Sequence, residues 1–197
     1  MKELTNRQKQ AKATKKKITG VVLEMCRKRD ISDITISEIC EAAGVSVGTF
    51  YHYFKTKEEI LTVSYKDFDN LLEEALENRE TTDDIIAEIL FVAEQYYDFS
   101  IHQERSFALN AYRMHLVLGN PQLTDTTRCF YKSIHELAVK WIDSNRLKLQ
   151  WNDKDLTDFI LRYIRSVVFD WISRSGEYDL KVQGMKDMAI ILNGLEK

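Results

Sequence analysis

The chain has 197 residues with one Pro and seven Gly, 44% hydrophobic and 30% charged residues, and a net charge of −3. This composition argues against disorder and favours a helix-rich globular protein, because Pro and Gly interrupt helices. No apolar run approaches the roughly 18 residues of a spanning helix and no signal peptide is recognisable, so we expect a cytoplasmic protein that does not contact a membrane. The three cysteines form no CxxC pair and fit reduced thiols.

Charge is distributed unevenly along the chain. Residues 1–57 carry twelve Lys and Arg against six Asp and Glu, a balance of +6, so residues 58–197 balance at −9. A basic segment on an acidic body is typical of a polyanion-binding module joined to a domain with another task, although a solvated basic helix has the same composition. We therefore expect a binding domain over residues 1–57 and a second domain over residues 58–197.

Helical periodicity and capping residues predict three helices in the first domain. The apolar face of the first, over roughly residues 8–29, is marked by Ile18, Val21, Val22 and Met25. Thr35 and Glu38 form a capping box that opens a short second helix, which stops at Gly44. Ser46 is placed to cap a third helix that runs to about residue 53.

The second domain begins with a long fourth helix, opened by a capping box of Thr56 and Glu59. Further apolar faces at helical spacing recur over about residues 85–97, 106–118, 130–141, 156–172 and 182–192. Gly119, Asn120 and Pro121 mark the end of the sixth helix. Since no strand pattern or repeat is visible, we expect an all-α fold of about nine helices.

Two short helices joined by a tight turn at Gly44 and Val45 form the pattern of a helix-turn-helix, whose second helix enters the major groove of DNA. Small residues, Gly48 and Thr49, leave the start of that helix slim enough to approach base edges. Hydroxyl, imidazole and ammonium groups that suit phosphates and bases follow in a short span, at Ser46, Thr49, Tyr51, His52, Tyr53 and Lys57.

The stretch ITISEICEAAGVSVGTFYHYFKTKEEIL, residues 34–61, resembles the signature of the tetracycline-repressor (TetR) family of bacterial transcription regulators. AGVS, GT, the aromatic YHYF block and KTKEEIL stand in the order and spacing of that family. FDWISRSGEYDL, residues 169–180, is more weakly similar to the C-terminal domains of the family. The chain departs from the pattern at Asp30, where the family usually has glycine at the end of the first helix.

The resemblance implies how matching residues would contact DNA. Thr35 and Ser37, at the start of the second helix, would contact phosphate or a base edge. The major groove would be faced by Val47, Gly48, Thr49 and His52, and phosphates would be bound by Tyr51, Tyr53 and Lys57.

Other chemistry is weighed against this interpretation. GVSVG at residues 44–48 also matches the GxSxG motif of serine hydrolases, but that motif requires a strand before the serine, and ISEICEAA predicts a helix. We therefore expect no enzyme and no catalytic residue, with Ser46 as a helix cap. The scattered histidines stand in no HExxH or CxxC setting, so we expect no metal and no cofactor.

An effector site and a dimer interface are predicted in the second domain. A mostly apolar pocket with a few polar anchors would bind a drug-like or lipid-like molecule, neutral or cationic rather than anionic, and would be lined by Phe107, Asn110, Tyr112, Met114, His115, Phe130, Trp141 and Phe169. The last two helices carry wide apolar faces and predict a homodimer through Tyr163, Val167, Trp171, Met185, Met188 and Leu192.

The resulting hypothesis is a dimeric repressor that binds a palindromic double-stranded operator and is released by a small molecule. Two alternatives remain open. One is a DNA-binding regulator controlled by a protein partner, with a fully packed second domain and no ligand pocket. The other, more remote, is the serine hydrolase, for which a strand before Ser46 is the minimum requirement.

Overall fold

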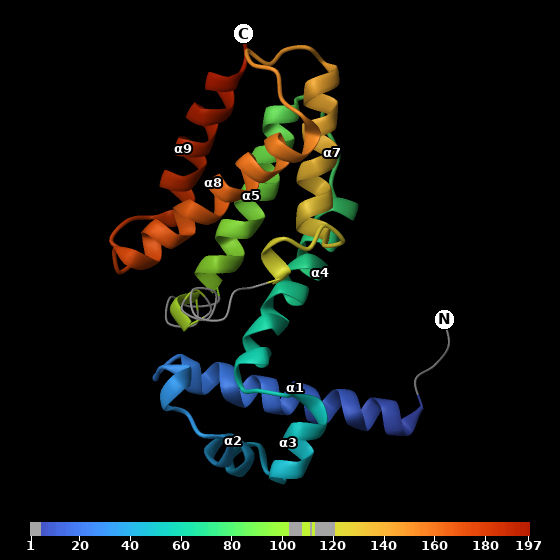
Figure 1. The fold of residues 1–197 in the computed structure, drawn as a ribbon, viewed down its shortest axis with the longest axis vertical. Coiled ribbons are helices and arrows are strands. Elements are labelled where there is room, and N and C mark those ends of the chain that lie inside the picture. The colour runs from blue at the N-terminus through green and yellow to red at the C-terminus, as the bar shows by residue number, and fades with distance from the viewer. Residues whose placement is uncertain (1–4, 103–107, 111, 113–120) are drawn as a thin grey trace. The chain divides into compact units, whose positions relative to one another are not determined.

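The computed structural model describes residues 5–102, 108–110, 112 and 121–197 (Figure 1). The chain divides into two compact units, one of residues 1–64 and 106–119 and the other of residues 65–105 and 120–197. In the described ranges the regular structure is helical, apart from a single antiparallel bridge between Leu147 and Glu196. The all-α prediction is confirmed. Among these residues no helix is long and apolar enough to cross a membrane.

Over residues 5–64, the first unit contains three α-helices and two short 3₁₀ turns. They are α1 (Asn6–Cys26), η1 (Ile31–Asp33), α2 (Ile36–Ala43), α3 (Val47–Tyr53) and η2 (Glu58–Thr62). The apolar faces predicted from the sequence close on one core, in which Ile18, Ile39 and Phe50 are completely buried. Burial of each such side chain contributes about 1.5–3 kcal/mol, so this small unit has a hydrophobic core of its own.

The end of α1 differs in detail from the expectation. The helix stops at Cys26, and Asp30 has a φ of −64° rather than the left-handed conformation of a glycine cap. The Asp30 carboxylate accepts a hydrogen bond from the Ser32 backbone N–H at 3.0 Å. Aspartate therefore begins the next turn as its N-cap, and no glycine is needed at this position.

The fourth helix also begins differently. The Thr56 hydroxyl accepts from the Glu59 N–H as expected, but the Glu59 carboxylate accepts from the Lys55 N–H rather than from Thr56. The chain therefore enters through η2, and α4 (Val63–Glu77) follows, spanning the boundary between the two units.

In its described residues, the second unit contains most of α4 and four further helices. They are α5 (Ile85–His102), α7 (Cys129–Asp143), α8 (Asp153–Ser173) and α9 (Leu180–Leu195), with a 3₁₀ turn, η3 (Pro121–Leu123), before α7. α5 packs against both α7 and α9, and α8 against α7 and α9. Gly184 on α9 is required by this packing, because a Cβ there would lie 2.8 Å from the Tyr97 ring on α5. The expected sixth helix, over about residues 106–118, lies largely outside the described residues. Its described residues, 108–110 and 112, are helical.

Candidate nucleic-acid interface

The helix α3 has one buried and one exposed face. Phe50 is completely buried and anchors the helix in the core of the first unit. On the opposite face Val47 is 45% and Tyr51 54% exposed, and Gly48 and His52 are exposed beside them. Spacings of one and four residues place these four residues on one stripe. Of the four residues that the sequence assigned to the major groove, Val47, Gly48 and His52 are therefore open to solvent, whereas Thr49 is half-buried and bonded to Ser46.

The turn before α3 has the geometry of a helix-turn-helix. Gly44 has a φ of 59°, a left-handed conformation that glycine adopts without strain. The Ser46 hydroxyl accepts a hydrogen bond from the Thr49 N–H at 3.0 Å and lies 2.8 Å from the Thr49 hydroxyl. The predicted cap is thus present. Because α2 and a turn precede Ser46, the strand that a serine hydrolase requires is absent there, and Ser46 has a structural role.

The start of α2 is fixed by the predicted capping box. The Glu38 N–H donates to the Thr35 hydroxyl at 3.2 Å, and the Glu38 carboxylate accepts from the Thr35 N–H at 2.7 Å. Arg29 donates to the same carboxylate at 3.0 Å. The bonds from the Thr35 backbone and hydroxyl, followed by Arg29, lower the pKa of Glu38 to about 2. Ser37, one residue before, remains exposed and available for an external partner.

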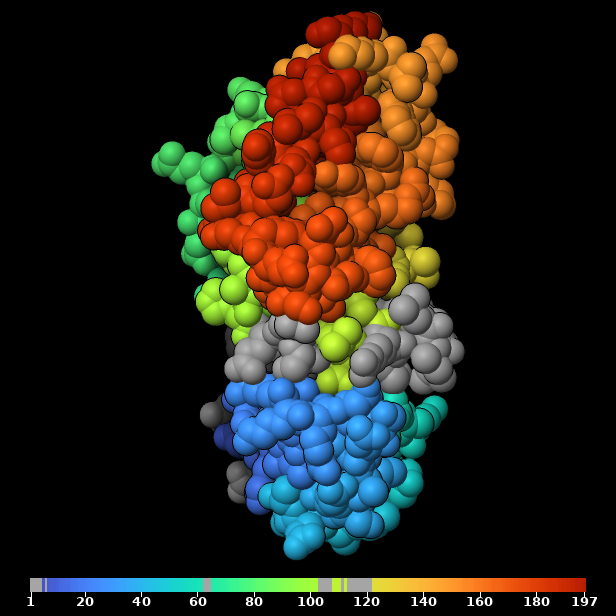
Figure 2. Space-filling view, turned by 90° about the vertical axis from the view of Figure 1, so that its left-hand side faces the viewer, coloured from blue at the N-terminus to red at the C-terminus, as the bar shows by residue number. Residues whose placement is uncertain are grey.

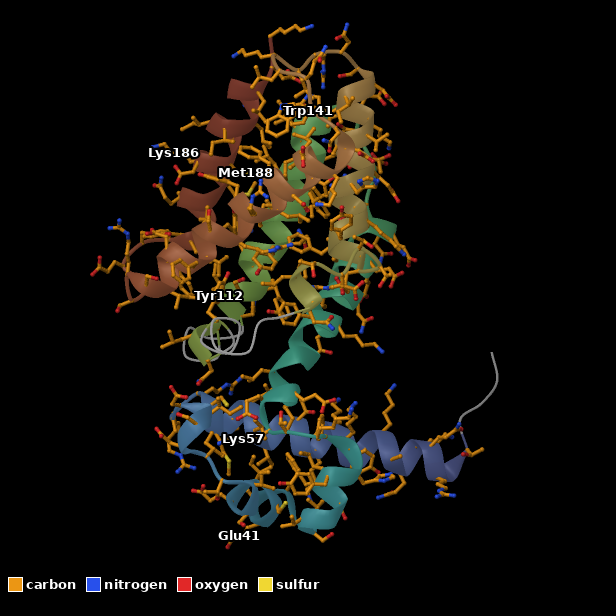
Figure 3. The ribbon with its side chains drawn as sticks, viewed as in Figure 1. Glu41, Lys57, Tyr112, Trp141, Lys186 and Met188 are labelled. Carbon is orange, nitrogen blue, oxygen red and sulfur yellow. The ribbon has the colours of Figure 1, made fainter. Side chains whose placement is uncertain are left out.

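Lys57 is held inside the unit. Its ammonium group donates to the carbonyl oxygens of Ser32 at 3.1 Å and Ile34 at 2.6 Å (Figure 3). These bonds join the chain after α3 to the loop before α2. An ammonium group has three donors, so one remains for a phosphate. Lys57, which is predicted to contact DNA, therefore also ties the chain after α3 to the chain before α2.

Lys57 lines a surface hollow of about 310 Å³ between the start of α2 and the chain after α3. The hollow is lined by Ser32, Ile34, Thr35, Ile36, Tyr51, Lys55, Thr56, Lys57 and Glu58. It combines the amide end of a helix with a phenol and two ammonium groups, which is the chemistry that binds a phosphate. Lys55, which the sequence interpretation did not select, is exposed here and carries no such internal bonds among the described contacts. Tyr53 is half-buried and its ring contacts His52 edge-on.

The residues predicted to line an effector pocket are dispersed in the structure. Phe130 is buried among the aromatic rings of α4 and α5, whereas Trp141 lies at the far end of α7 and donates to Glu196 (Figure 3). Phe169 is 45% exposed on α8. Tyr112 is half-buried, and Phe107, Met114 and His115 lie outside the described residues.

Asn110, also assigned to the pocket, belongs to the first unit. Its side chain is 4% exposed and accepts from the Ile31 N–H at 3.0 Å. It also donates to the carbonyl oxygens of Cys26 at 3.1 Å and Arg29 at 3.4 Å. Asn110 therefore satisfies the backbone where α1 ends, a contact between residues about 80 positions apart that local sequence patterns do not reveal.

The residues predicted to form a dimer interface lie on α8 and α9, which form one surface of the second unit (Figure 2). Val167, Met188 and Leu192 are buried in the core of the chain itself, and Tyr163, Trp171 and Met185 are half-buried. Figure 3 shows Met188 on the inward side of α9 and Lys186 on the outward side. The large apolar side chains exposed on these helices are Phe169, Val182 and Ile190.

The comparisons with known proteins agree with this site. The sequence profile of "Bacterial regulatory proteins, tetR family" matches residues 22–62. The HTH-type transcriptional regulator BetI of Escherichia coli is 32% identical over 65 residues, a third of each chain. The fatty acid metabolism regulator protein of Bacillus subtilis is 20% identical over 195 residues, which cover 95% of this chain and 98% of that protein.

A solved structure extends the likeness to the whole fold. The transcriptional regulator FadR from Bacillus subtilis, in complex with stearoyl-CoA, superposes with a TM-score of 0.72 at 18% identity, covering 92% of this chain and 99% of that one. The profile match lies on the helices and the turn described above, and the shared fold includes both units. Over residues 22–62 this chain therefore matches a family of bacterial transcription regulators, and its fold over both units is that of the solved regulator FadR.

Proposed function

We propose that this regulator binds a palindromic operator as a homodimer in the cytoplasm, represses transcription there, and is released by a small molecule bound in its second unit. The observation that carries the DNA-binding part is the open stripe of α3 beside the hollow that holds Lys57. Val47, Gly48 and His52 of this stripe, together with Thr49, would read base edges in the major groove. The hollow, which Tyr51 also lines, would seat a phosphate and set the register.

Selection from random duplexes tests this reading of DNA. We expect an inverted repeat, because a two-fold dimer reads two equivalent half-sites. Thr49→Ala and His52→Ala should each change the preference at particular base pairs by about 1–3 kcal/mol, whereas Tyr51→Ala should weaken all sequences alike. Unchanged base preferences in both groove variants would remove those residues from the readout.

The homodimer would form through the exposed face of α8 and α9. Phe169, Val182 and Ile190 present apolar area that water does not favour, and a second copy is the partner that two-fold operators require. Val182→Glu with Ile190→Glu should give monomers in sedimentation that bind the operator weakly. Leu149→Glu is the matched control, since Leu149 is 65% exposed but lies outside this face. A wild-type monomer at micromolar concentration would contradict the proposal.

The effector would carry a long apolar portion. The complex of the similar FadR with stearoyl-CoA supports this class, and the −9 balance of residues 58–197 favours a neutral molecule. Stearoyl-CoA and a neutral stearate ester are therefore the first two probes, with coenzyme A alone as the control. Either acylated probe should lower operator affinity.

A regulator controlled by a protein partner is the second candidate. It is favoured by the ring-to-ring packing of Phe68, Tyr96, Phe99 and Phe130, which fills part of the second unit with the chain's own side chains. Failure of both acylated probes to change operator affinity would support this candidate over the effector proposal.

A further inference from the structure

The cations of the first unit fall into two groups. Towards the end of α1 and beyond it, Arg27 and Lys28 pair with Glu24, and Arg29 pairs with Glu38. In the first half of α1, by contrast, Arg7, Lys9 and Lys12 are exposed and form no ion pair within the described residues. Among the cations of α1 and the residues just after it, those that can meet an external partner are therefore concentrated in the first half of the helix.

This end of α1 projects beyond the core of its unit. Buried side chains of the helix begin at Ile18, and residues 7–10, 12 and 13 are exposed. Figure 1 shows the N-terminal part of α1 extending past α3. Twelve residues, 6–17, correspond to about 18 Å of helix. We call residues 6–17 the basic overhang.

The positive charges of the basic overhang destabilise the helix that carries them. The first turn contains no acidic residue, so within the described part of α1 no carboxylate of that turn offsets the positive end of the helix dipole. Lys9 and Lys12 repel at three residues' spacing, and Lys12 and Lys16 at four. The Thr5–Gln8 capping box holds the end of the helix against this repulsion. A polyanion beside the overhang would relieve both unfavourable terms.

We propose that the basic overhang is a second DNA-contacting surface, which binds the phosphate backbone outside the base pairs faced by α3. Its position supports this partner, because the Lys15 ammonium lies 5.2 Å from the centre of the Phe54 ring, at the C-terminal end of α3. A duplex seated on α3 would continue past the overhang. The contact adds affinity without adding sequence preference. This inference rests on the proposed operator binding.

Salt titrations of operator binding test the proposal with two matched variants. The first, Arg7→Gln/Lys9→Gln/Lys12→Gln, removes three charges from the overhang. The second, Arg27→Gln/Lys28→Gln, removes the two charges that pair with Glu24 near the other end of α1. The overhang variant should reduce the logarithmic salt slope by about two to three per protomer, and the affinity by about tenfold or more at moderate salt. The base preferences of both variants should stay at wild-type values. The salt slope of the second variant should also equal that of the wild type.

Two further measurements distinguish a failure of this inference from a failure of the proposed operator binding. Hydroxyl-radical protection of the operator should shorten at both ends in the overhang variant, and the thermal stability of the free variant should equal or exceed that of the wild type because repulsion is removed. A wild-type slope in the overhang variant, or equal losses in both variants, would overturn the inference while operator binding stands. Absence of any selected site for the wild-type protein would overturn the proposed function itself.

Discussion

Lys57 combines two tasks in one side chain, since its ammonium group bonds two carbonyl oxygens and also lines the hollow proposed for a phosphate. Charged hydrogen bonds of this kind contribute about 1.5–3 kcal/mol. These bonds hold the Lys57 side chain in position in the absence of DNA. Lys55 lines the same hollow and is exposed, so the two lysines allow positioning and charge to be separated.

We expect Lys57→Ala to lower both operator affinity and the free energy of unfolding, the latter by about 1–3 kcal/mol. Lys55→Ala should lower operator affinity alone, because its side chain carries no such internal bonds among the described contacts. Denaturant unfolding and fluorescence anisotropy measure the two effects. Equal stability of both variants would mean that the carbonyl bonds of Lys57 add nothing net.

At the residue scale, the sequence predicts what local chemistry determines. The Thr35 and Ser46 caps and the end of the second helix at Gly44 depend on neighbours within three or four positions, and all three predictions are confirmed. The partners of Lys57 and Asn110 lie 23 to 84 residues away. No periodicity or capping rule encodes such contacts, so both side chains were assigned to ligands alone.

At the scale of elements, α7 begins with a cap taken from another helix. Arg128, its N-cap residue, makes no side-chain cap, and the Asp69 carboxylate of α4 accepts from the Phe130 N–H at 3.2 Å instead. The same carboxylate binds the Arg128 guanidinium at 2.8 and 3.1 Å. Arg128 is 8% exposed and also donates to the carbonyl oxygens of Tyr65 and Gln122. One ion pair thus joins α4, η3 and α7.

Asp69→Ala should therefore cost about 3–5 kcal/mol of unfolding free energy, because it leaves a buried guanidinium unpaired. Asp69→Ala/Arg128→Met should recover much of the loss, since the uncompensated charge is then removed. Tryptophan fluorescence during denaturant unfolding reports on this unit, where all three tryptophans lie. A double variant as unstable as the single one would show that the charge is not the cause.

Helix periodicity predicts the elements of the second unit well, because apolar residues at three- and four-residue spacing recur along α5, α7, α8 and α9. It does not predict how much of each apolar face a neighbouring helix covers. Val167, Met188 and Leu192 were assigned to a dimer surface on the width of these faces, and the structure places them in the chain's own core. The area left exposed depends on packing, which a single sequence does not state.

At the scale of the whole molecule, the chain passes between the two units three times. The first unit takes residues 1–64 and 106–119, and the second takes the rest. The charge balance placed the boundary after residue 57 and treated each domain as one continuous stretch. A later segment that returns to an earlier unit leaves no mark in composition, so its membership follows only from contacts such as those of Asn110.

Asn110→Ala should destabilise the first unit by about 1–3 kcal/mol for each backbone group left buried without a partner. The Ile31 amide should exchange its hydrogen faster, because the bond from its N–H is lost. Asn78→Ala is the control, since Asn78 is exposed and its side chain bonds only the Glu74 carbonyl in the described contacts. Unchanged Ile31 exchange in Asn110→Ala would contradict this role.

The same contact sets an order of events during synthesis. When a ribosome has released only the first 64 residues, the carbonyls of Cys26 and Arg29 and the amide of Ile31 still lack the side chain that satisfies them. The nascent first unit can form these three hydrogen bonds only after Asn110 has left the exit tunnel, well after its own helices have been made. The first unit therefore gains its last buried hydrogen bonds only once residues 65–105, part of the second unit, have also been translated.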